Sequence, residues 1–218
     1  MNKILRRILA LLTGIVEQGP MLFIGSPYYK DRTSLFQSLS NTNKSIVFVG
    51  DSLIEGCEWH ELLESPYVKN RGISGDNTYG LLHRIDNIIE SKPDKIFLMI
   101  GINDLNSGND VSQITDNYNE ILSQVTKKLP NTKVYVHSVL PINSNLYHCK
   151  KAINKKIISL NKEIERLSQS YFSSYIDLYN VMSGQDGQLK SDLTNDGLHL
   201  NGNGYNVWKN SITKYVFN

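Results

Sequence analysis

The sequence predicts one α/β domain, a three-layer α/β/α sandwich in which helices cover both faces of a doubly wound parallel sheet. Short runs of β-branched and aromatic residues, typical of strands buried on both faces, recur along the chain. Longer segments with an apolar residue every three or four positions alternate with these runs. No linker or internal repeat interrupts the alternation, which favours parallel βαβ units within a single domain.

Five apolar runs are the strand candidates: three at residues 46–49, 96–100 and 133–139, and two further ones at 67–70 and 174–178. The helix candidates are segments whose apolar residues form one stripe, at residues 81–89, 114–129, 153–167 and 207–215. We interpret these stripes as the sides of helices that face the core.

Composition excludes several classes of protein. The chain has 218 residues, with 23 basic and 21 acidic side chains and a formal charge of +2. Because 40% of the residues are hydrophobic and 20% charged, a disordered or fibrous protein is excluded. No dense block of Lys and Arg stands out, so we expect no nucleic-acid partner. Cys57 and Cys149 match no metal or redox spacing, and we expect buried free thiols.

The N-terminal segment, residues 1–30, is assigned separately from the domain at residues 31–218. Basic residues precede an apolar run at 8–16, as in a signal peptide. Polar residues and a proline interrupt the run at 17–20, so it is too short to span a membrane. The alternative is an amphipathic helix on the domain or on a membrane surface. The sequence leaves export or envelope attachment and a cytoplasmic location both open.

The first candidate site residue is Ser52, which follows the strand candidate at 46–49 in the order Gly50-Asp51-Ser52. A serine at a sharp strand-to-helix turn exposes its hydroxyl and offers its backbone N–H, as a nucleophile with an oxyanion donor requires. The alternative is a helix N-cap, because Asp51 and Ser52 both suit that position and Glu55 lies three residues after Ser52.

The second candidate is the pair Asp196 and His199, just before the last helix candidate. A general base needs a carboxylate at Nδ1 while Nε2 faces the nucleophile, and a turn can place both side chains on one side. The alternative is a turn aspartate beside a surface histidine. The remaining histidines have no such partner nearby. His60 resembles part of a zinc-protease motif, but the second histidine is missing, so we expect no metal site.

Two further signals follow strand candidates. Asn103 comes after the run at 96–100, where asparagine is also a common turn former. The loop at residues 71–76 contains Gly75, and a glycine there lets a substrate approach the backbone. Each signal is modest alone, but their appearance together and in this order favours an enzyme.

These motifs resemble the four sequence blocks of the SGNH (GDSL-type) hydrolases. The matching positions are Gly50-Asp51-Ser52-Leu53, the loop with Gly75, Gly101-x-Asn103-Asp104 and Asp196-x-x-His199. The chain is especially similar to the branch that includes the platelet-activating-factor acetylhydrolase catalytic subunits, bacterial acylhydrolases and carbohydrate O-acetylesterases. Support for that branch comes from Glu58-Trp59-His60-Glu61-Leu62 and Asn70-x-Gly72-x-x-Gly75-Asp76.

The resemblance implies about five parallel strands in flavodoxin-like order. It implies Ser52 as nucleophile, with Asp196 and His199 completing the triad, and no metal or organic cofactor. It further implies an oxyanion hole made by the N–H groups of Ser52 and Gly75 and the side-chain amide of Asn103.

We therefore expect a serine esterase. Without a long insertion to form a lid, the pocket should suit a short acyl group, with an acetylated sugar as the first choice. The alternatives are an acetyl-phospholipid hydrolase, a thioesterase or a lysophospholipase on the same scaffold, and more remotely a catalytically silent carbohydrate-binding module. The expected partner is a small-molecule or glycan ester; membrane contact is expected only through the N-terminal segment, and the oligomeric state stays open.

Overall fold

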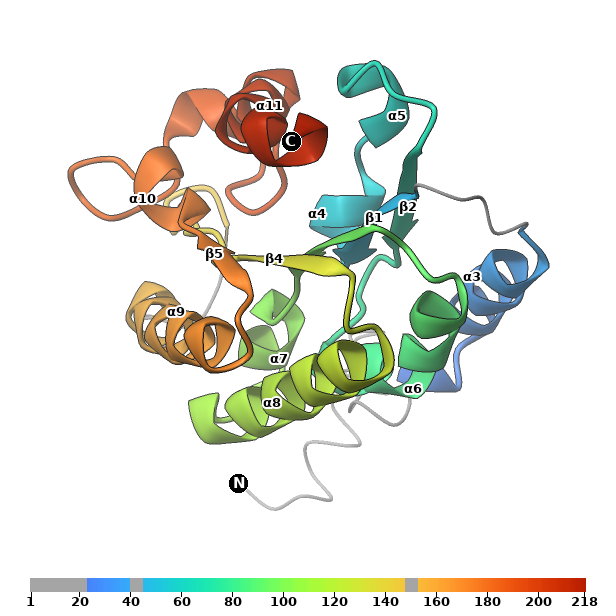
Figure 1. The fold of residues 1–218 in the computed structure, drawn as a ribbon. Helices are drawn as coiled ribbons and strands as arrows, with labels where there is room; N and C mark the ends of the chain where they lie inside the picture. The colour runs from blue at the N-terminus through green and yellow to red at the C-terminus, as the bar shows by residue number, and fades with distance from the viewer. Residues whose placement is uncertain (1–22, 40–44, 148–152) are drawn as a thin grey trace.

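A computed structural model describes residues 23–39, 45–147 and 153–218 of the chain. Its core is one parallel sheet of five strands in the order β2-β1-β3-β4-β5 (Figure 1). The strands are β1 (Ile46–Gly50), β2 (Val68–Gly72), β3 (Lys95–Met99), β4 (Lys133–His137) and β5 (Ser174–Ile176). The predicted three-layer fold and its flavodoxin-like strand order are both confirmed.

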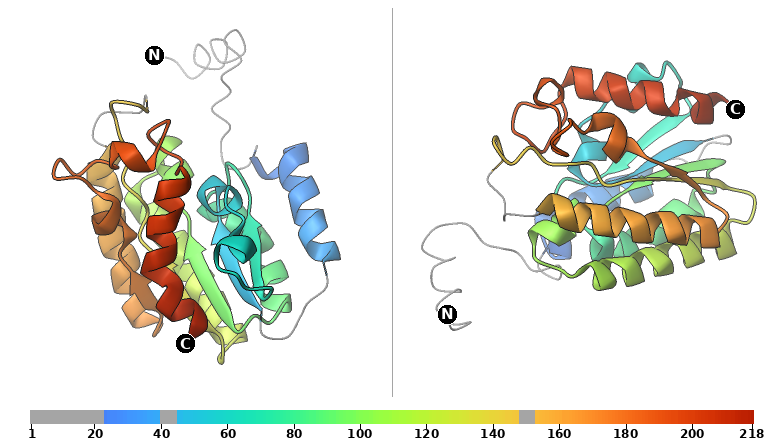
Figure 2. Two further views of the ribbon diagram at one scale, coloured as in Figure 1. Left: turned by 90° about the horizontal axis from the view of Figure 1, so that it is seen from above. Right: turned by 90° about the vertical axis from the view of Figure 1, so that its left-hand side faces the viewer.

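Helices form a layer on each face of the sheet, as the right-hand view of Figure 2 shows. One layer contains α6 (Thr78–Glu90), α7 (Ile102–Asn106), α8 (Val111–Lys128) and α9 (Ile153–Ser170). The other contains α4 (Ser52–Glu55), α5 (Trp59–Leu62), α10 (Leu178–Met182), the 3-10 helix η1 (Ser191–Leu193) and α11 (Gly202–Phe217). Helix α3 (Pro27–Ser38) lies beside α6 at the outer side of β2.

Alternation along the strands explains why both faces are apolar. In β1, Val47 and Val49 join the core under α6, α8 and α9, whereas Phe48 joins the core under α5 and α11. Phe48 stacks on Phe97 of the neighbouring strand at 4.7 Å between ring centroids, and Phe97 stacks on Tyr135 at 4.6 Å. Because Phe48, Phe97 and Tyr135 are directly paired across the strands, this aromatic row favours the observed register of β1, β3 and β4.

The four helices predicted from apolar stripes are present as α6, α8, α9 and α11. Two strand candidates are shorter than predicted: β4 ends at His137 and β5 at Ile176, where the Asp177 side chain caps α10 by accepting the Asn180 N–H at 3.0 Å. A helix was expected directly after β1, where α4 lies, but the short helices α5, α7 and α10 were not predicted, because four or five residues are too few to display a stripe.

Helix α3 was also missed, and only Tyr29 and Phe36 of its residues are buried. It begins after Ser26, whose hydroxyl accepts the Tyr29 N–H at 3.2 Å, and it crosses the boundary predicted at residue 30. The leader-like residues 1–22 and Cys149 lie outside the described residues, so the predictions for them stay predictions. Cys57 is a buried free thiol.

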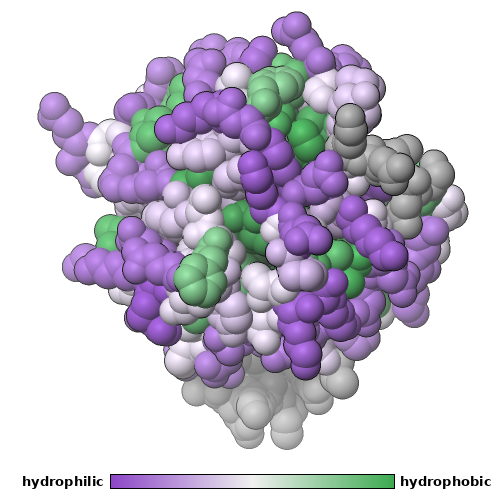
Figure 3. All heavy atoms as spheres, viewed as in Figure 1, coloured by the Kyte–Doolittle hydropathy of each residue, from purple (hydrophilic) through white to green (hydrophobic). Residues whose placement is uncertain are grey.

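The surface seen in Figure 3 is mostly hydrophilic, with apolar side chains in small separate patches. Across residues 23–39, 45–147 and 153–218, no helix has the length and apolar character needed to cross a membrane.

Candidate active site

The candidate site residues gather where β1, β2 and β3 end. Ser52 follows β1, Gly75 follows β2 and Asn103 follows β3, and these three strands are neighbours in the sheet. In open parallel sheets, ligands bind beyond the carboxyl ends of the strands, next to the point where the strand order reverses. That point lies between β1 and β3 here.

Ser52 is the first residue of α4, and Asp51 is the N-cap. The Asp51 carboxylate accepts the Leu53 N–H at 3.0 Å, so the serine hydroxyl is not used for capping. Instead, Ser52 Oγ lies 3.0 Å from Nε2 of His199. The alternative in which Ser52 caps the helix with Glu55 is therefore wrong, and Glu55 bonds elsewhere.

His199 is oriented by Asp196 in the loop between η1 and α11. Its Nδ1 lies 2.7 Å from Asp196 Oδ2, while Oδ1 accepts the backbone N–H of Leu198 at 2.9 Å and of His199 at 2.7 Å. Partial burial raises the pKa of the Asp196 carboxyl, but the bonds from the His199 ring and from the two N–H groups outweigh it and lower the pKa to about 2. At neutral pH an ionised carboxylate thus faces the Nδ1 side of the imidazole.

The turn that brings Asp196 and His199 together depends on Gly197, which has a φ of +86°. Its N–H donates to the hydroxyl of the buried Thr194 at 2.9 Å, and its carbonyl accepts the Asn143 N–H at 2.8 Å. The loop is therefore held from two sides.

Three groups are arranged as candidate oxyanion donors. The N–H of Ser52 stands at the start of a helix, where no intrahelical carbonyl can accept it. Gly75 has a φ of +82° and is exposed in the loop after β2. Asn103 Nδ2 donates to the Asp76 carbonyl at 2.8 Å, and an amide nitrogen carries a second N–H.

A buried cluster of ionisable side chains adjoins these donors along the chain. Asp51, Asp76 and Asp104, each adjacent in sequence to a candidate donor, are at most 1% exposed. Arg84 of α6 binds Asp76 through Nε and Nη2, both at 2.8 Å, and donates to the carbonyl of Gly50 at 3.1 Å. The loops after β1 and β2 are thereby tied to α6.

Burial dominates the titration of this cluster. Desolvation raises the pKa of the Asp51 carboxyl to about 7 and that of Asp76 to about 6, although Arg84 acts in the opposite direction on Asp76. Desolvation also raises the pKa of Asp104, which accepts the N–H of Thr78 at 2.9 Å and its hydroxyl at 2.6 Å. The sequence motifs included the aspartates but missed Arg84; an arginine within the apolar stripe of α6 was the available signal.

A surface cavity of about 450 Å³ lies near the turn that carries His199, but none of the candidate site residues lines it. Polar groups form much of its lining, which includes Asn143, Asp186, Lys190 and Asp192. Asn143 also donates to the Gly197 carbonyl and, through Nδ2, to the Leu189 carbonyl at 2.9 Å, so the cavity wall is bonded to the turn that carries His199.

A family model for GDSL-like lipases and acylhydrolases matches residues 48–207, well over half of the chain. The chain belongs to the GDSL-like lipase/acylhydrolase family. The family predicted from the four motifs is confirmed, and this GDSL-like protein is a carboxylic ester hydrolase.

Relatives of this GDSL-like hydrolase include platelet-activating factor acetylhydrolase IB subunit alpha1 of Bos taurus. It is 28% identical over 166 residues, which cover 73% of this chain and 69% of that protein. A solved structure of a platelet activating factor from Streptococcus pneumonia is 27% identical, with a TM-score of 0.77. The match covers 99% of this chain and 100% of that one. A GDSL-like lipase from Bacteroides thetaiotaomicron is 25% identical, with a TM-score of 0.75. The match covers 87% of this chain and 97% of that one.

His137 lies fully buried at the end of β4 between Phe97 and Trp208. Within the described residues, neither of its ring nitrogens has a hydrogen-bond partner. Burial lowers the pKa of this histidine to about 3, so it is neutral in the folded protein at ordinary pH. In the described ranges, no group of three or more His, Cys, Asp or Glu side chains is placed to hold a metal ion.

Proposed function

We propose that this hydrolase removes short acyl groups, acetyl above all, from esters by using Ser52 as nucleophile, His199 as general base and Asp196 as the residue that orients it. The observation that carries the proposal is the unbroken chain of contacts from Ser52 Oγ to His199 Nε2 at 3.0 Å and from His199 Nδ1 to Asp196 at 2.7 Å. Nucleophile, base and orienting carboxylate in this order are the requirements of serine acyl transfer.

The reaction proceeds in two steps, acylation of Ser52 and hydrolysis of the acyl-enzyme. Ser52 Oγ bonds to the ester carbon as its proton passes to Nε2 of His199, and the carbonyl oxygen becomes an oxyanion held by the donors of Ser52, Gly75 and Asn103. The bond to the leaving alcohol then breaks, and His199 gives the proton to the alcohol oxygen. A water molecule then attacks the carbonyl carbon of the acyl-enzyme while its proton passes to His199. The bond to Ser52 Oγ breaks, His199 returns the proton to that oxygen, and the acid is released.

Two observations support an acetyl group on a carbohydrate as substrate. The relatives named platelet-activating factor acetylhydrolase carry acetyl hydrolysis in their name, which favours a short acyl group. The cavity bonded to the His199 turn has amide, carboxylate and ammonium groups in its lining. Such groups suit the hydroxyls of a sugar better than an alkyl chain.

An acetyl phospholipid is the second candidate, because the same relatives are named for platelet-activating factor. The two candidates share the acyl group and differ in the alcohol. The comparison of alcohols is therefore the decisive measurement.

The test is a hydrolysis panel of acetylated xylo-oligosaccharides, acetyl phospholipids and p-nitrophenyl esters with the wild type and Ser52→Ala. We expect the acetylated sugars to give the highest kcat/KM and the variant to be folded and inactive. A higher kcat/KM on the phospholipid would move the assignment to the second candidate. An active Ser52→Ala protein would refute the proposed nucleophile.

A further inference from the structure

Glu55 occupies a position that the proposed reaction does not yet explain. It is the last residue of α4, the four-residue helix that Ser52 begins. Its carboxylate turns toward the loop after β2, where Oε2 accepts the backbone N–H of Ser74 at 2.8 Å and also the Ser74 hydroxyl. Ser74 directly precedes Gly75, so one side chain links the nucleophile's helix to the residue beside a candidate oxyanion donor.

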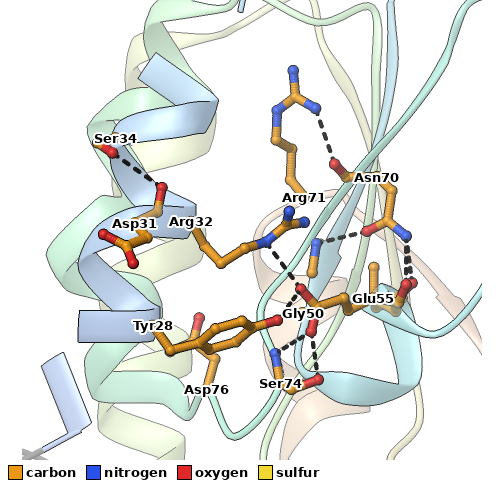
Figure 4. Close-up of polar contacts among 12 residues, drawn as sticks. Tyr28, Asp31, Arg32, Ser34, Gly50, Glu55, Asn70, Arg71, Ser74 and Asp76 are labelled. Atoms are coloured by element: carbon orange, nitrogen blue, oxygen red, sulfur yellow. Dashed lines mark hydrogen bonds and ion pairs between the residues drawn. The ribbon is translucent and has the colours of Figure 1, made fainter. Parts of the chain in front are cut away.

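The other oxygen of Glu55 is held by helix α3. Tyr28 donates its hydroxyl to Oε1 at 2.6 Å, and Arg32 Nε lies 3.0 Å from the same atom (Figure 4). Tyr28 and Arg32 are four residues apart and therefore share one side of α3. The Glu55 side chain is 17% exposed and the Arg32 side chain 27%, whereas Tyr28 is 46% exposed, so the carboxylate is the most buried of the three groups.

Helix α3 is itself firmly placed. The Tyr29 hydroxyl donates to the Gly80 carbonyl at 2.6 Å in a buried bond. The ring of Phe36 has the guanidinium groups of Arg32 and Arg71 at 4.8 and 5.0 Å from its centroid. Ahead of the helix, the Phe23 ring packs on Gly75 so closely that a Cβ added there would lie 2.9 Å from it. The segment from Phe23 to Phe36 thus contacts the Ser74–Gly75 loop directly and also through Glu55.

Charge strengthens this arrangement. Burial raises the pKa of the Glu55 carboxyl, but the bonds from Ser74 and Tyr28 and the charge of Arg32 outweigh it, and the pKa is lowered overall. An ionised acceptor makes shorter and stronger hydrogen bonds than a neutral one. Glu55 is therefore a rigid, charged link among α3, α4 and the loop.

We propose that Glu55 is a positioning residue that holds the Ser74–Gly75 loop in the conformation needed for the oxyanion donor, and that α3 buttresses it through Tyr28 and Arg32. The inference rests on the proposed function, because it needs Gly75 to be a donor. Glu55 and Ser74 lie within the residues matched by the family model, whereas Tyr28 and Arg32 of α3 lie N-terminal to them.

A positioning role and a merely structural role differ in what they change. If Glu55 only stabilises the fold, its removal lowers the melting temperature and leaves kcat per folded molecule intact. If it positions the loop, kcat falls while KM stays close to the wild-type value, because an oxyanion donor acts in the transition state more than in substrate binding.

The experiment compares Glu55→Ala, Glu55→Gln, Ser74→Ala and the double variant Glu55→Ala/Ser74→Ala on one acetyl ester. A misplacement of about 1 Å in an active site can cost about 10²-fold in rate, so we expect Glu55→Ala to lower kcat by about 10- to 100-fold with KM within about twofold. Glu55→Gln keeps the shape and should lose less. The double variant should be no worse than Glu55→Ala, because the Ser74 hydroxyl acts through Glu55.

Glu61→Ala is the matched control, since this exposed carboxylate of α5 contacts the exposed ring of His60. A folded Glu55→Ala enzyme with wild-type kcat, or additive losses in the double variant, would overturn the proposal. Unchanged kcat in the pair Tyr28→Phe/Arg32→Met would overturn the part assigned to α3. An inactive wild type or an active Ser52→Ala protein would instead mean that the proposed function itself has failed.

Discussion

Replacing Gly197 with alanine tests whether the turn between Asp196 and His199 sets the geometry of the candidate triad. The φ of +86° costs a residue with a side chain about 1–2 kcal/mol. An alanine Cβ would lie 2.5 Å from the Asn143 carbonyl oxygen and 2.7 Å from the Tyr147 nitrogen. Real Cβ contacts essentially never fall under 3.0 Å. The Cβ and the Asn143 oxygen must therefore move apart by at least 0.5 Å, the difference between 3.0 and 2.5 Å.

The turn cannot make this shift without moving His199. The Gly197 carbonyl accepts the Asn143 N–H, and its own N–H donates to Thr194, so a movement breaks one of these bonds or carries the turn with it. His199 lies two residues further on, with Nε2 at 3.0 Å from Ser52 Oγ. Because about 1 Å of misplacement can cost about 10²-fold, we expect Gly197→Ala to lower kcat by about tenfold or more.

The assay is the hydrolysis of p-nitrophenyl acetate, with kcat and KM measured well below the melting temperature of each variant. Gly202→Ala is the control, because a Cβ on this first residue of α11 meets no atom within 4 Å. It should keep wild-type kcat. If Gly197→Ala retains kcat within about twofold of the wild type, the turn does not set the triad geometry and the reasoning is wrong.

Three further predictions concern the donor, the acyl group and the buried histidine. Asn103→Ala should lower kcat by about 10²–10³-fold with little change in KM, and Asn103→Asp should be at least as damaging; an active Asp variant would exclude the donor role. Acetyl and propionyl esters should give higher kcat/KM than octanoyl esters, and a rise with chain length would favour a lipase or thioesterase. The pKa of His137 is lowered to about 3, whereas the unfolded chain has the ordinary value of about 6.5. The unfolded state therefore takes up the proton first, and stability is lost as pH falls from about 6.5 toward 3, by about 2 kcal/mol between about pH 7.5 and 5. Urea melts of His137→Phe should lack this loss relative to the wild type; parallel pH dependences of the two proteins would contradict it.

The Asp51 and Asp76 carboxyls act in the opposite sense, because their pKa values are raised to about 7 and about 6 in the folded protein. The folded state holds these protons more tightly, so the corresponding stability is present at low pH and is lost as pH rises through the folded pKa values. This is why the His137 measurement uses the difference between wild type and variant, in which the contributions of the two aspartates cancel.

Much of the fold could be predicted from the sequence because its signals are local. The run at residues 46–49 and the stripe at 153–167 report burial on two faces or on one, and burial follows from the spacing of apolar residues. The strand order was available only through the family resemblance, since periodicity says nothing about which strands are neighbours. Short helices such as α5 carry too few residues for a periodic signal, and α3 buries only Tyr29 and Phe36 of its twelve residues.

By itself, the sequence determined which residue types stand at the ends of the strands and in the Asp196–His199 turn. Such motifs depend on backbone geometry within a few residues, and that geometry is encoded locally. Only the tertiary structure decided that Ser52 and His199, 147 positions apart, come within 3.0 Å, and that Asp51 takes the helix cap. The same holds for the pairing of Glu55 with Ser74 and of Arg84 with Asp76. The contacts of Ser52 with His199 and of Glu55 with Ser74 join segments that meet only after the sheet has assembled, so their energies arise from packing and desolvation, which no short stretch of sequence contains.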